Sequence, residues 1–469
     1  MNVRKGETIQ LEIHKMAYGG AGVGRVDGFV VFVRGGVPGD LLQARVYRKK
    51  KEYAEARILE VISPSPHRVE APCPYSGHCG GCPWQHVADE KQLEYKREHV
   101  FESLGHIGGL KEAPVRNILP APKQFGYRNK MEFSFSDRRW FLPHELDRRG
   151  TEEGFALGLH VPGTFSKVID VEACLLQEET GNQILRETKG FVKESRIPPY
   201  GLKSHQGFWR FLTLRHSKAH DCWMVNVVTS EERPDVMSSL ARRLSERFTN
   251  IETVVNSINS RKAAIAVGEK ETVLTGRGWI RDRIGPFTFQ ISASSFFQTN
   301  TLAALTLYEQ VRAFARLTGR ETVLDLYSGT GTIPIFLSQK VHSVTGIEIN
   351  ADAVQDAQRN CQDNGIDNCR FICGDIRERL SALDERPDVL IIDPPRAGMH
   401  KDVLAQVMDL SPERVVYISC NPATLARDLG EMTRDYELLE IQPVDLFPHT
   451  YHVEAVAGLR ARRHPKKRI

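Results

Sequence analysis

The chain has 469 residues, which is more than one hydrophobic core normally supports and predicts two to four domains. Hydrophobic residues make up 41% of it and charged residues 26%, as in ordinary globular proteins. No apolar run approaches the roughly 20 residues that span a bilayer, and the opening segment MNVRKGETIQLEIHK has no apolar signal-peptide core. Nine cysteines in such a chain predict reduced thiols, metal ligands or catalytic groups rather than a disulfide framework. We therefore expect a cytoplasmic protein without a membrane partner.

The net charge is only +4, but the basic residues are concentrated in two places. RKKK occupies residues 48–51, and the chain ends in RARRHPKKRI at residues 460–469. Such runs are solvated surface in most proteins, and they indicate a phosphate-rich partner only when other observations agree.

Hydrophobic patterning divides the chain into three blocks, so we expect a multidomain fold. Residues 1–62 alternate short β-type runs with glycine turns, which is typical of a small, OB-like β-barrel. The proline-rich stretch 63–74 is typical of a linker and begins a block, residues 63–290, that mixes strand and helix signals and is interpreted as an α+β domain. Residues 291–469 alternate strands and helices, which predicts a Rossmann-like α/β domain around a parallel sheet.

Short apolar runs in the last block each end in a residue that can bind a ligand or react. In open α/β sheets, ligands bind beyond the carboxyl ends of the strands, so these residues are expected to face one crevice. They are Asp325, Glu348, Asp375, Asp393 and Cys420.

The turn at Gly329–Gly331 allows a ligand close to the backbone, and Glu348 follows where an acid would bind ribose hydroxyls. A dinucleotide would explain both features, but Pro334 stands where the third glycine of that fingerprint belongs. Asp325 would also repel a pyrophosphate, whereas it suits a cationic sulfonium. The sequence therefore favours S-adenosylmethionine over NAD.

Cys420 stands at a strand end before Asn-Pro, where it is either a small buried residue or a nucleophile. A thiolate that adds to carbon 6 of a pyrimidine makes carbon 5 nucleophilic enough to accept a methyl group. A base must then remove the carbon-5 proton, and the candidates are His449, His452 and Glu454. The DPPR segment ending at Arg396 lacks the aromatic residue that amino-methyltransferases use to stack a flipped adenine.

Five ordered segments carry a recognisable signature: FFQTN (296–300), DLYSGTGT (325–332), DPPR (393–396), SCNP (419–422) and FPHTYHVE (447–454). They resemble the signature of the RNA uracil-5-methyltransferases. With its N-terminal barrel, the chain further resembles the bacterial 23S rRNA (uracil-5-)-methyltransferases that carry a TRAM domain.

The resemblance implies that Cys420 is the nucleophile and Glu454 the base, and that the product is 5-methyluridine in 23S rRNA. It also implies an S-adenosylmethionine site lined by Gln298, Tyr327, Gly329, Glu348, Asp375 and Asp393. A tRNA uracil-5-methyltransferase would have the same motifs, so that alternative stays open. An RNA-binding protein with an inert methyltransferase fold is the third alternative, which the intact thiol, acid and cofactor residues disfavour.

Cys73, Cys79 and Cys82 have a C-x5-C-x2-C spacing that suits a metal. From spacing alone, zinc and an iron–sulfur cluster are both open, and His78 or His86 could be a fourth ligand. Family members with three such cysteines hold a [4Fe-4S] cluster. The resemblance therefore implies that cluster, with Cys174 in the context DVEACLL as its fourth ligand.

The expected partner is RNA, bound by the barrel and presented as a splayed single-stranded loop. Phe296, Phe297 and Trp84 are possible stacking residues, although each could equally belong to the core. We expect the chain to act as a monomer.

Overall fold

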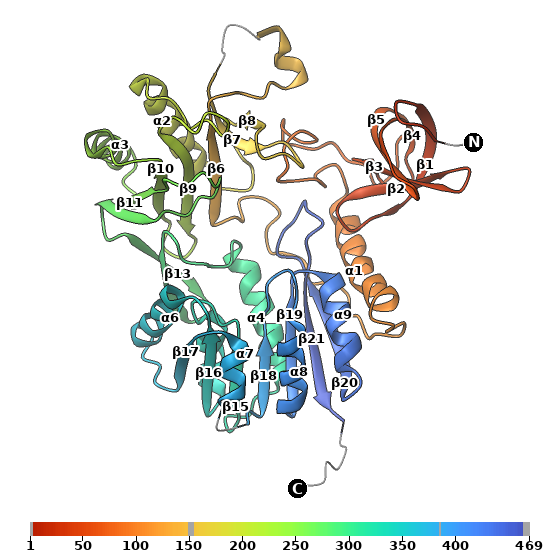
Figure 1. The fold of residues 1–469 in the computed structure, drawn as a ribbon, viewed down its shortest axis with the longest axis vertical. Coiled ribbons are helices and arrows are strands. Elements are labelled where there is room, and N and C mark those ends of the chain that lie inside the picture. Colours follow the sequence, from red (N-terminus) through yellow and green to blue (C-terminus); the bar gives the residue numbers. More distant parts are fainter. Residues whose placement is uncertain (1–2, 149–153, 384–385, 463–469) are drawn as a thin grey trace.

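The computed structural model describes residues 3–148, 154–383 and 386–462. Figure 1 shows a small barrel beside two larger units, one above the other. Within the described ranges, no helix has both the length and the apolar character needed to cross a membrane. The basic segment 463–469, which forms most of the predicted C-terminal basic run, lies outside the described residues.

The N-terminal unit is a closed five-stranded barrel, which confirms the predicted barrel fold. Its strands alternate buried and exposed residues, so that one side of each strand fills the interior. The order around the barrel is β1-β2-β3-β5-β4. The strands are β1 (Thr8–Met16), β2 (Ala21–Val26), β3 (Phe29–Arg34), β4 (Leu41–Lys49) and β5 (Tyr53–Ser63).

The central unit is a mixed seven-stranded sheet in the order β12-β11-β10-β9-β6-β7-β8, with β10 and β11 parallel and the other neighbours antiparallel. This agrees with the predicted α+β class. The strands are β6 (Lys130–Ser136), β7 (Ala156–His160), β8 (Val168–Asp170), β9 (Trp209–Ser217), β10 (Cys222–Thr229), β11 (Ile251–Ile258) and β12 (Lys270–Thr275). The helices are α2 (Glu179–Ser195) and α3 (Pro234–Arg247), which pack against each other and on this sheet, and the short η1 (Pro143–Arg148).

A hairpin joins the central unit to the last one. It consists of β13 (Trp279–Ile284) and β14 (Phe287–Ser292), and it packs against both the central sheet and the helices of the last unit. The predicted boundary between residues 290 and 291 therefore falls inside β14.

The last unit has the predicted Rossmann-like fold. Its strand order is β17-β16-β15-β18-β19-β21-β20, parallel except for β21, which runs antiparallel to both neighbours. The strands are β15 (Thr322–Leu326), β16 (Ser343–Glu348), β17 (Cys369–Cys373), β18 (Val389–Ile392), β19 (Arg414–Ser419), β20 (Tyr436–Val444) and β21 (Glu454–Ala461).

Helices cover both faces of this sheet, so its strands are buried almost throughout. One face carries α4 (Thr301–Ala315), α5 (Thr332–Leu337), the short η2 (Ser338–Lys340) and α6 (Ala351–Asp363). The other carries α7 (Ile376–Ser381), α8 (Lys401–Leu410) and α9 (Pro422–Met432).

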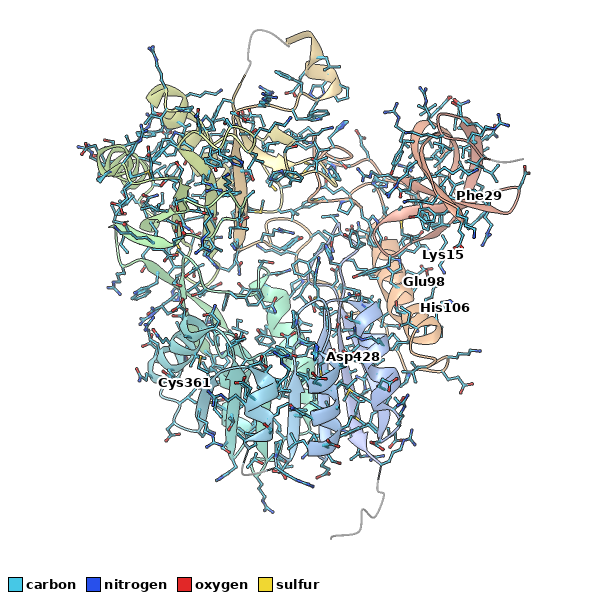
Figure 2. The ribbon with its side chains drawn as sticks, in the orientation of Figure 1. Lys15, Phe29, Glu98, His106, Cys361 and Asp428 are labelled. Carbon is cyan, nitrogen blue, oxygen red and sulfur yellow. The ribbon has the colours of Figure 1, made fainter. Side chains whose placement is uncertain are left out.

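Helix α1 (Asp89–His106) connects the barrel to the last unit and packs on α9 (Figure 1). On the barrel side, Lys15 forms an ion pair with Glu102, and Figure 2 shows Lys15 above the labelled Glu98 of α1 at this junction. On the other side, Lys96 donates to the Asp445 carboxylate at 2.6 Å and to the carbonyl of Phe447 at 3.0 Å. The Lys96 and Asp445 side chains are both buried, so this pair fixes the loop after β20 to α1.

Lys96→Met should destabilise the protein by about 3–5 kcal/mol, because it leaves the buried Asp445 charge without its partner. The matched control is Lys91→Met, which removes the exposed Lys91–Glu94 pair on the same helix and should cost at most about 1 kcal/mol. Urea denaturation followed by circular dichroism measures both. Equal shifts of the two midpoints would show that the buried pair does not stabilise this junction.

Candidate active site

The carboxyl edge of the last sheet holds a deeply buried acid, Asp325. Asp325 is 1% exposed, and within the described part of the chain neither of its carboxylate oxygens has a hydrogen-bond partner. Burial, reinforced by the nearby Asp393 and Glu348 carboxylates, raises the pKa of Asp325 well above its usual value. A buried acid without donors is costly unless a ligand supplies a positive charge or a hydrogen bond.

The two neighbouring acids differ in how they are held. Burial raises the pKa of Asp393, just after β18, to about 7. Glu348, at the end of β16, instead accepts hydrogen bonds from the backbone N–H groups of Gly329 (3.0 Å) and Asn350 (2.8 Å). The predicted glycine turn and acid are therefore in direct contact.

Backbone geometry explains why the turn after β15 needs glycine. Tyr327, Gly329 and Gly331 all have positive φ angles (66°, 52° and 78°). A Cβ on Gly331 would lie 2.8 Å from Phe371 and 2.9 Å from Ala357, so a side chain there would clash. A Cβ on Gly329 would meet no atom within 4 Å, so that position is constrained by its backbone conformation rather than by packing.

The FFQTN segment lies against this turn. Thr330 Oγ1 donates to the carbonyl of Phe296 at 3.3 Å, and Asn129 Nδ2 of the central unit donates to the carbonyl of Gln298 at 2.7 Å. Asn300 then caps α4, with its side chain accepting from the N–H of Ala303. Gln298 and the turn therefore lie at one edge of the sheet, Gln298 is half-buried, and its contact with a cofactor stays a prediction.

Asp375 has a structural task that the sequence analysis missed. It caps α7, and its carboxylate pairs with Arg377 at 2.5 Å. The hydrogen bond from the Arg377 side chain lowers the pKa of Asp375 to about 2. An Asp followed two residues later by a basic residue at a helix start is the signal that could have indicated this cap. Its contact with a cofactor stays a prediction.

The Asn-Pro turn after Cys420 begins α9. The Asn421 side chain accepts from the N–H of Ala423, and Pro422 occupies the first turn of the helix, where no amide donor is needed. Asn421 Nδ2 also donates to the carbonyl of Arg396 at 2.9 Å, which joins this turn to the DPPR segment. The half-buried Cys420 is thus held between two anchored segments.

The surroundings of Cys420 control its ionisation. Burial, with the charges of the Glu454 and Asp393 carboxylates, raises the pKa of the thiol to about 11, while the Arg396 guanidinium opposes this shift through its charge and a hydrogen bond. Arg396 is therefore the group that favours the thiolate. From the sequence, Arg396 was notable only because it stands where amino-methyltransferases have an aromatic residue.

Glu454 is the first residue of β21 and is 7% exposed. Burial, followed by the Asp393 charge, raises the pKa of Glu454 to about 8, while Arg396 opposes this shift. A carboxylate with a pKa near neutrality can accept a proton and release it again at physiological pH.

The two histidines proposed as alternative bases are weaker candidates. Burial lowers the pKa of both to about 4. His452 lies 2.9 Å from the Arg396 guanidinium, and His449 stacks on Phe125 while its backbone N–H donates to Gln92. Both rings therefore fit positioning roles better than proton transfer.

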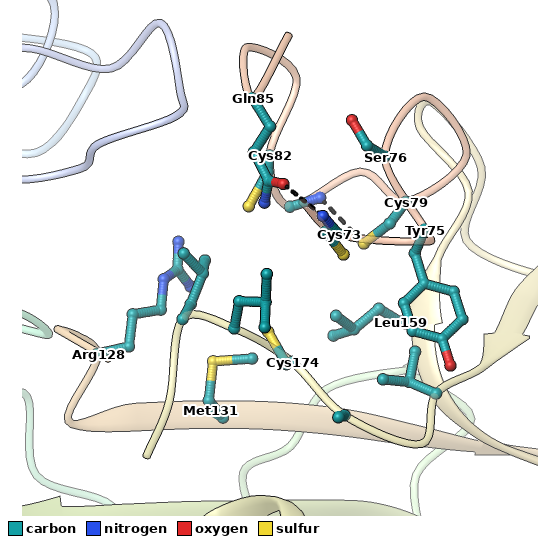
Figure 3. Close-up of a pocket in the computed structure, with 15 residues that line it drawn as sticks. Cys73, Tyr75, Ser76, Cys79, Cys82, Gln85, Arg128, Met131, Leu159 and Cys174 are labelled. Atoms are coloured by element: carbon teal, nitrogen blue, oxygen red, sulfur yellow. Dashed lines mark hydrogen bonds between the residues drawn. The ribbon is translucent and has the colours of Figure 1, made fainter. Parts of the chain in front are cut away.

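The four predicted cysteine ligands meet in the central unit. They line a single cavity of about 60 Å³, together with Arg128 and Gln85 (Figure 3). Burial raises the pKa of each thiol, and the Arg128 guanidinium opposes this for three of them. Across the described ranges, no three His, Cys, Asp or Glu side chains lie close enough to share one metal ion. The four are Cys73, Cys79, Cys82 and Cys174.

The three aromatic residues proposed for stacking have different environments. Trp84 is fully buried beneath the barrel junction, and Phe297 is buried in the core of the last unit. Phe296 is 67% exposed, and its carbonyl accepts the hydrogen bond from Thr330 of the glycine turn. Phe296 is therefore accessible for stacking on a nucleotide, whereas Trp84 and Phe297 are core residues.

Comparisons with known proteins agree on one family. The model of the tRNA (uracil-5-)-methyltransferase family matches residues 222–462, and that of the TRAM domain matches residues 2–59. A protein of Chlorobaculum tepidum named an uncharacterized RNA methyltransferase is 43% identical, over 97% of this chain and 96% of its own. A protein of the same description from Halalkalibacterium halodurans is 37% identical, over 97% and 98%. The crystal structure of Pyrococcus abyssi tRNA (uracil-54, C5)-methyltransferase in complex with S-adenosyl-L-homocysteine is 30% identical, covers 96% of this chain and 100% of its own, and has a TM-score of 0.74.

Alkylation by iodoacetamide should reveal the charges around Cys420. At pH 9 the Cys420 thiol, with a pKa of about 11, should react more slowly than the exposed Cys373. Glu454→Gln removes a charge that raises this pKa, so it should accelerate the reaction, whereas Arg396→Ala should slow it. Below the pKa, each unit by which it falls multiplies the thiolate fraction about tenfold. Peptide mass spectrometry measures the rates, and identical rates in both variants would contradict this electrostatic account.

Proposed function

The chain belongs to the tRNA (uracil-5-)-methyltransferase family, and from its site we propose that it transfers a methyl group to carbon 5 of a uridine in 23S rRNA through a covalent adduct with Cys420. The observation that carries this proposal is the pairing of a thiol and a buried acid at one edge of the sheet. Cys420 and Glu454 lie at the ends of two adjacent strands. The charges of the same two neighbours, Asp393 and Arg396, shift the pKa values of both groups.

In the proposed reaction, the Cys420 thiolate forms a bond to carbon 6 of uracil, and the electron pair of the 5,6 double bond becomes an enolate. The electron pair on carbon 5 would then form a bond to the methyl group of the donor, whose methyl–sulfur bond would break and leave a neutral thioether. Glu454 removes the carbon-5 proton, the double bond forms again, and the carbon–sulfur bond breaks to return the thiolate. The pKa of about 8 lets Glu454 serve as this base, and Arg396 stabilises the thiolate at the start and the end.

We propose S-adenosylmethionine as the methyl donor, which supplies an electrophilic methyl group on a cationic sulfonium. The buried Asp325 carboxylate fits a cationic ligand, because within the described residues its oxygens have no hydrogen-bond partner and only acids shift its pKa by their charge. The related Pyrococcus abyssi enzyme was solved with S-adenosyl-L-homocysteine. The residues proposed to hold the donor are Gln298, Tyr327, Gly329, Glu348, Asp375 and Asp393.

We propose that the cysteine cavity holds a [4Fe-4S] cluster. Four thiols around a single cavity match the ligand set of such a cluster. Four thiolates could also bind one zinc ion, and the iron analysis described below separates the two ligands. Arg128 at the cavity wall would offset part of the negative charge of four thiolates.

The barrel supports RNA as the substrate, since RKKK is exposed at the end of β4 and beyond it. The barrel alone does not separate rRNA from tRNA, because the match to the Pyrococcus abyssi tRNA enzyme covers that whole chain. We keep 23S rRNA as the proposed substrate and tRNA as the second candidate. One chain contains every proposed catalytic and cofactor residue, so a monomer suffices.

Anaerobically purified protein should contain about four irons per chain and be brown, as four thiolate ligands on a [4Fe-4S] centre require. Cys79→Ala and Cys174→Ala should lose the iron, whereas Cys373→Ala, which changes an exposed cysteine outside the cavity, should keep it. Iron analysis and visible absorption measure this. Stoichiometric zinc in a colourless protein would contradict the cluster.

Cys420→Ala should abolish methyl transfer while S-adenosylmethionine still binds, because the thiol serves the chemistry rather than the donor site. Glu454→Gln should reduce turnover about 100- to 10,000-fold and accumulate a methylated RNA–protein adduct, because the thiol cannot leave while the carbon-5 proton remains. Denaturing electrophoresis detects the adduct, and the double variant should form none. Residual methylation by Cys420→Ala would contradict the covalent mechanism, and normal turnover by Glu454→Gln would move the base to His449 or His452.

The same adduct distinguishes the substrates. RNA containing 5-fluorouridine should trap the wild-type protein, because fluorine at carbon 5 cannot leave as a cation. Transcribed 23S rRNA should form the adduct, and a tRNA pool should not. Trapping by tRNA alone would instead establish the second candidate.

A further inference from the structure

The turn between β1 and β2 is the part of the barrel that contacts the loop before Glu454. The carbonyl of Ala17 accepts from the N–H of Gly20 at 3.0 Å, which closes the turn around Tyr18. The carbonyl of Gly20 accepts from Trp84 Nε1 at 3.3 Å. A Cβ on Gly20 would lie 3.0 Å from the ring of Tyr451, so the backbone of the barrel touches the loop that precedes Glu454.

Tyr18 itself packs between this loop and α1. Its ring meets the edge of Tyr451 with centroids 5.7 Å apart and an interplanar angle of 79°, and it meets His99 at 5.7 Å and 86°. His99 in turn contacts the carbonyl of Met16 at 3.0 Å, which anchors the end of β1. Two aromatic contacts and an anchored turn therefore fix the direction of the Tyr18 ring.

From Tyr18, a short series of contacts leads to the reacting groups. The Tyr451 ring lies 4.4 Å from the His452 ring, and His452 contacts the Arg396 guanidinium. The ionisable groups that shift the pKa of the Tyr18 hydroxyl include Arg396, Cys420 and Glu454. Burial raises the pKa of Tyr18 to about 12, so its hydroxyl remains a neutral donor at physiological pH.

Despite these contacts, Tyr18 keeps 40% of its surface exposed. An aromatic ring that is fixed on one side, open on the other and close to a nucleophile can stack on or flank a base that has left its helix. Building on the function proposed above, we propose that Tyr18 is a substrate-positioning residue, with which the barrel completes the methyl-transfer site by contacting the RNA nucleotide presented to Cys420.

The proposal separates two tasks of the barrel. Exposed lysines attract RNA at a distance, without regard to sequence. Tyr18 instead acts on the last step, in which the base is held against the thiol. Loss of one aromatic stacking contact typically weakens nucleic-acid binding about 5- to 150-fold.

The test compares Tyr18→Ala, Tyr18→Phe and a matched control, Tyr47→Ala. Tyr47 is 42% exposed, lies on the same barrel, and has Glu55, Arg34 and Arg48 as its neighbours. The measurements are the KM for RNA and the rate of adduct formation with 5-fluorouridine-containing 23S rRNA, together with S-adenosylmethionine affinity and thermal stability. Tyr18→Ala should lower the ratio of adduct rate to KM at least about fivefold, with donor affinity unchanged. Tyr18→Phe keeps the ring and should stay within about threefold of wild type, and Tyr47→Ala should match wild type.

A second measurement does not depend on activity. Tyr18→p-azidophenylalanine should cross-link on irradiation to the nucleotide that forms the Cys420 adduct or to a direct neighbour of it, whereas Tyr47→p-azidophenylalanine should not cross-link there. Equal effects of Tyr18→Ala and Tyr47→Ala, or no cross-link near the adduct, would overturn the inference while leaving the methyl-transfer proposal intact. If the wild-type protein forms no adduct with either rRNA or tRNA, the proposed function fails first.

Discussion

The arrangement at the sheet edge depends on burying acids close together. Burial raises the pKa of Asp325, Asp393 and Glu454, and the charge of neighbouring carboxylates adds to the shift for Asp325 and Glu454. In an isolated fold this concentration of negative charge would be a defect, since ionising all three acids costs free energy. Here Arg396 offsets part of it, and a cationic methyl donor would offset more. Burial, with the Asp393 charge added to it, raises the pKa of Glu454 to about 8, which suits that group to take a proton.

Sequence reasoning located this edge because the strands of a parallel sheet end on the same side. That rule brought Asp325, Asp393 and Cys420 together without knowledge of any contact. It gave no sign that Asp375 caps α7 and pairs with Arg377, and the contact of Asp375 with a cofactor stays a prediction. It could not choose between core and surface for Phe296 and its neighbour, because adjacent side chains differ in exposure only once the packing is known.

Contacts between residues far apart in the chain could not be predicted from the sequence. The spacing of Cys73, Cys79 and Cys82 indicated a metal site, but Cys174 was reached by family resemblance, and only folding brings it to the same cavity. Nothing in the sequence around Tyr18 indicated a role near the active site. Its relevance arises from how the barrel docks on α1 and the loop before β21, and no periodicity within the first block encodes that contact.

The buried Lys96–Asp445 pair has a consequence for the way this chain can be divided. The region that matches the methyltransferase family begins at residue 222, yet α1, which supplies Lys96, lies far upstream of it. A C-terminal segment without α1 would lack Lys96, the ion-pair partner of Asp445. The loop before Glu454 would also lose its contacts with that helix. The methyltransferase fold of this protein is therefore not a transplantable module, and exchanging its N-terminal barrel for another would require α1 to stay with the catalytic half.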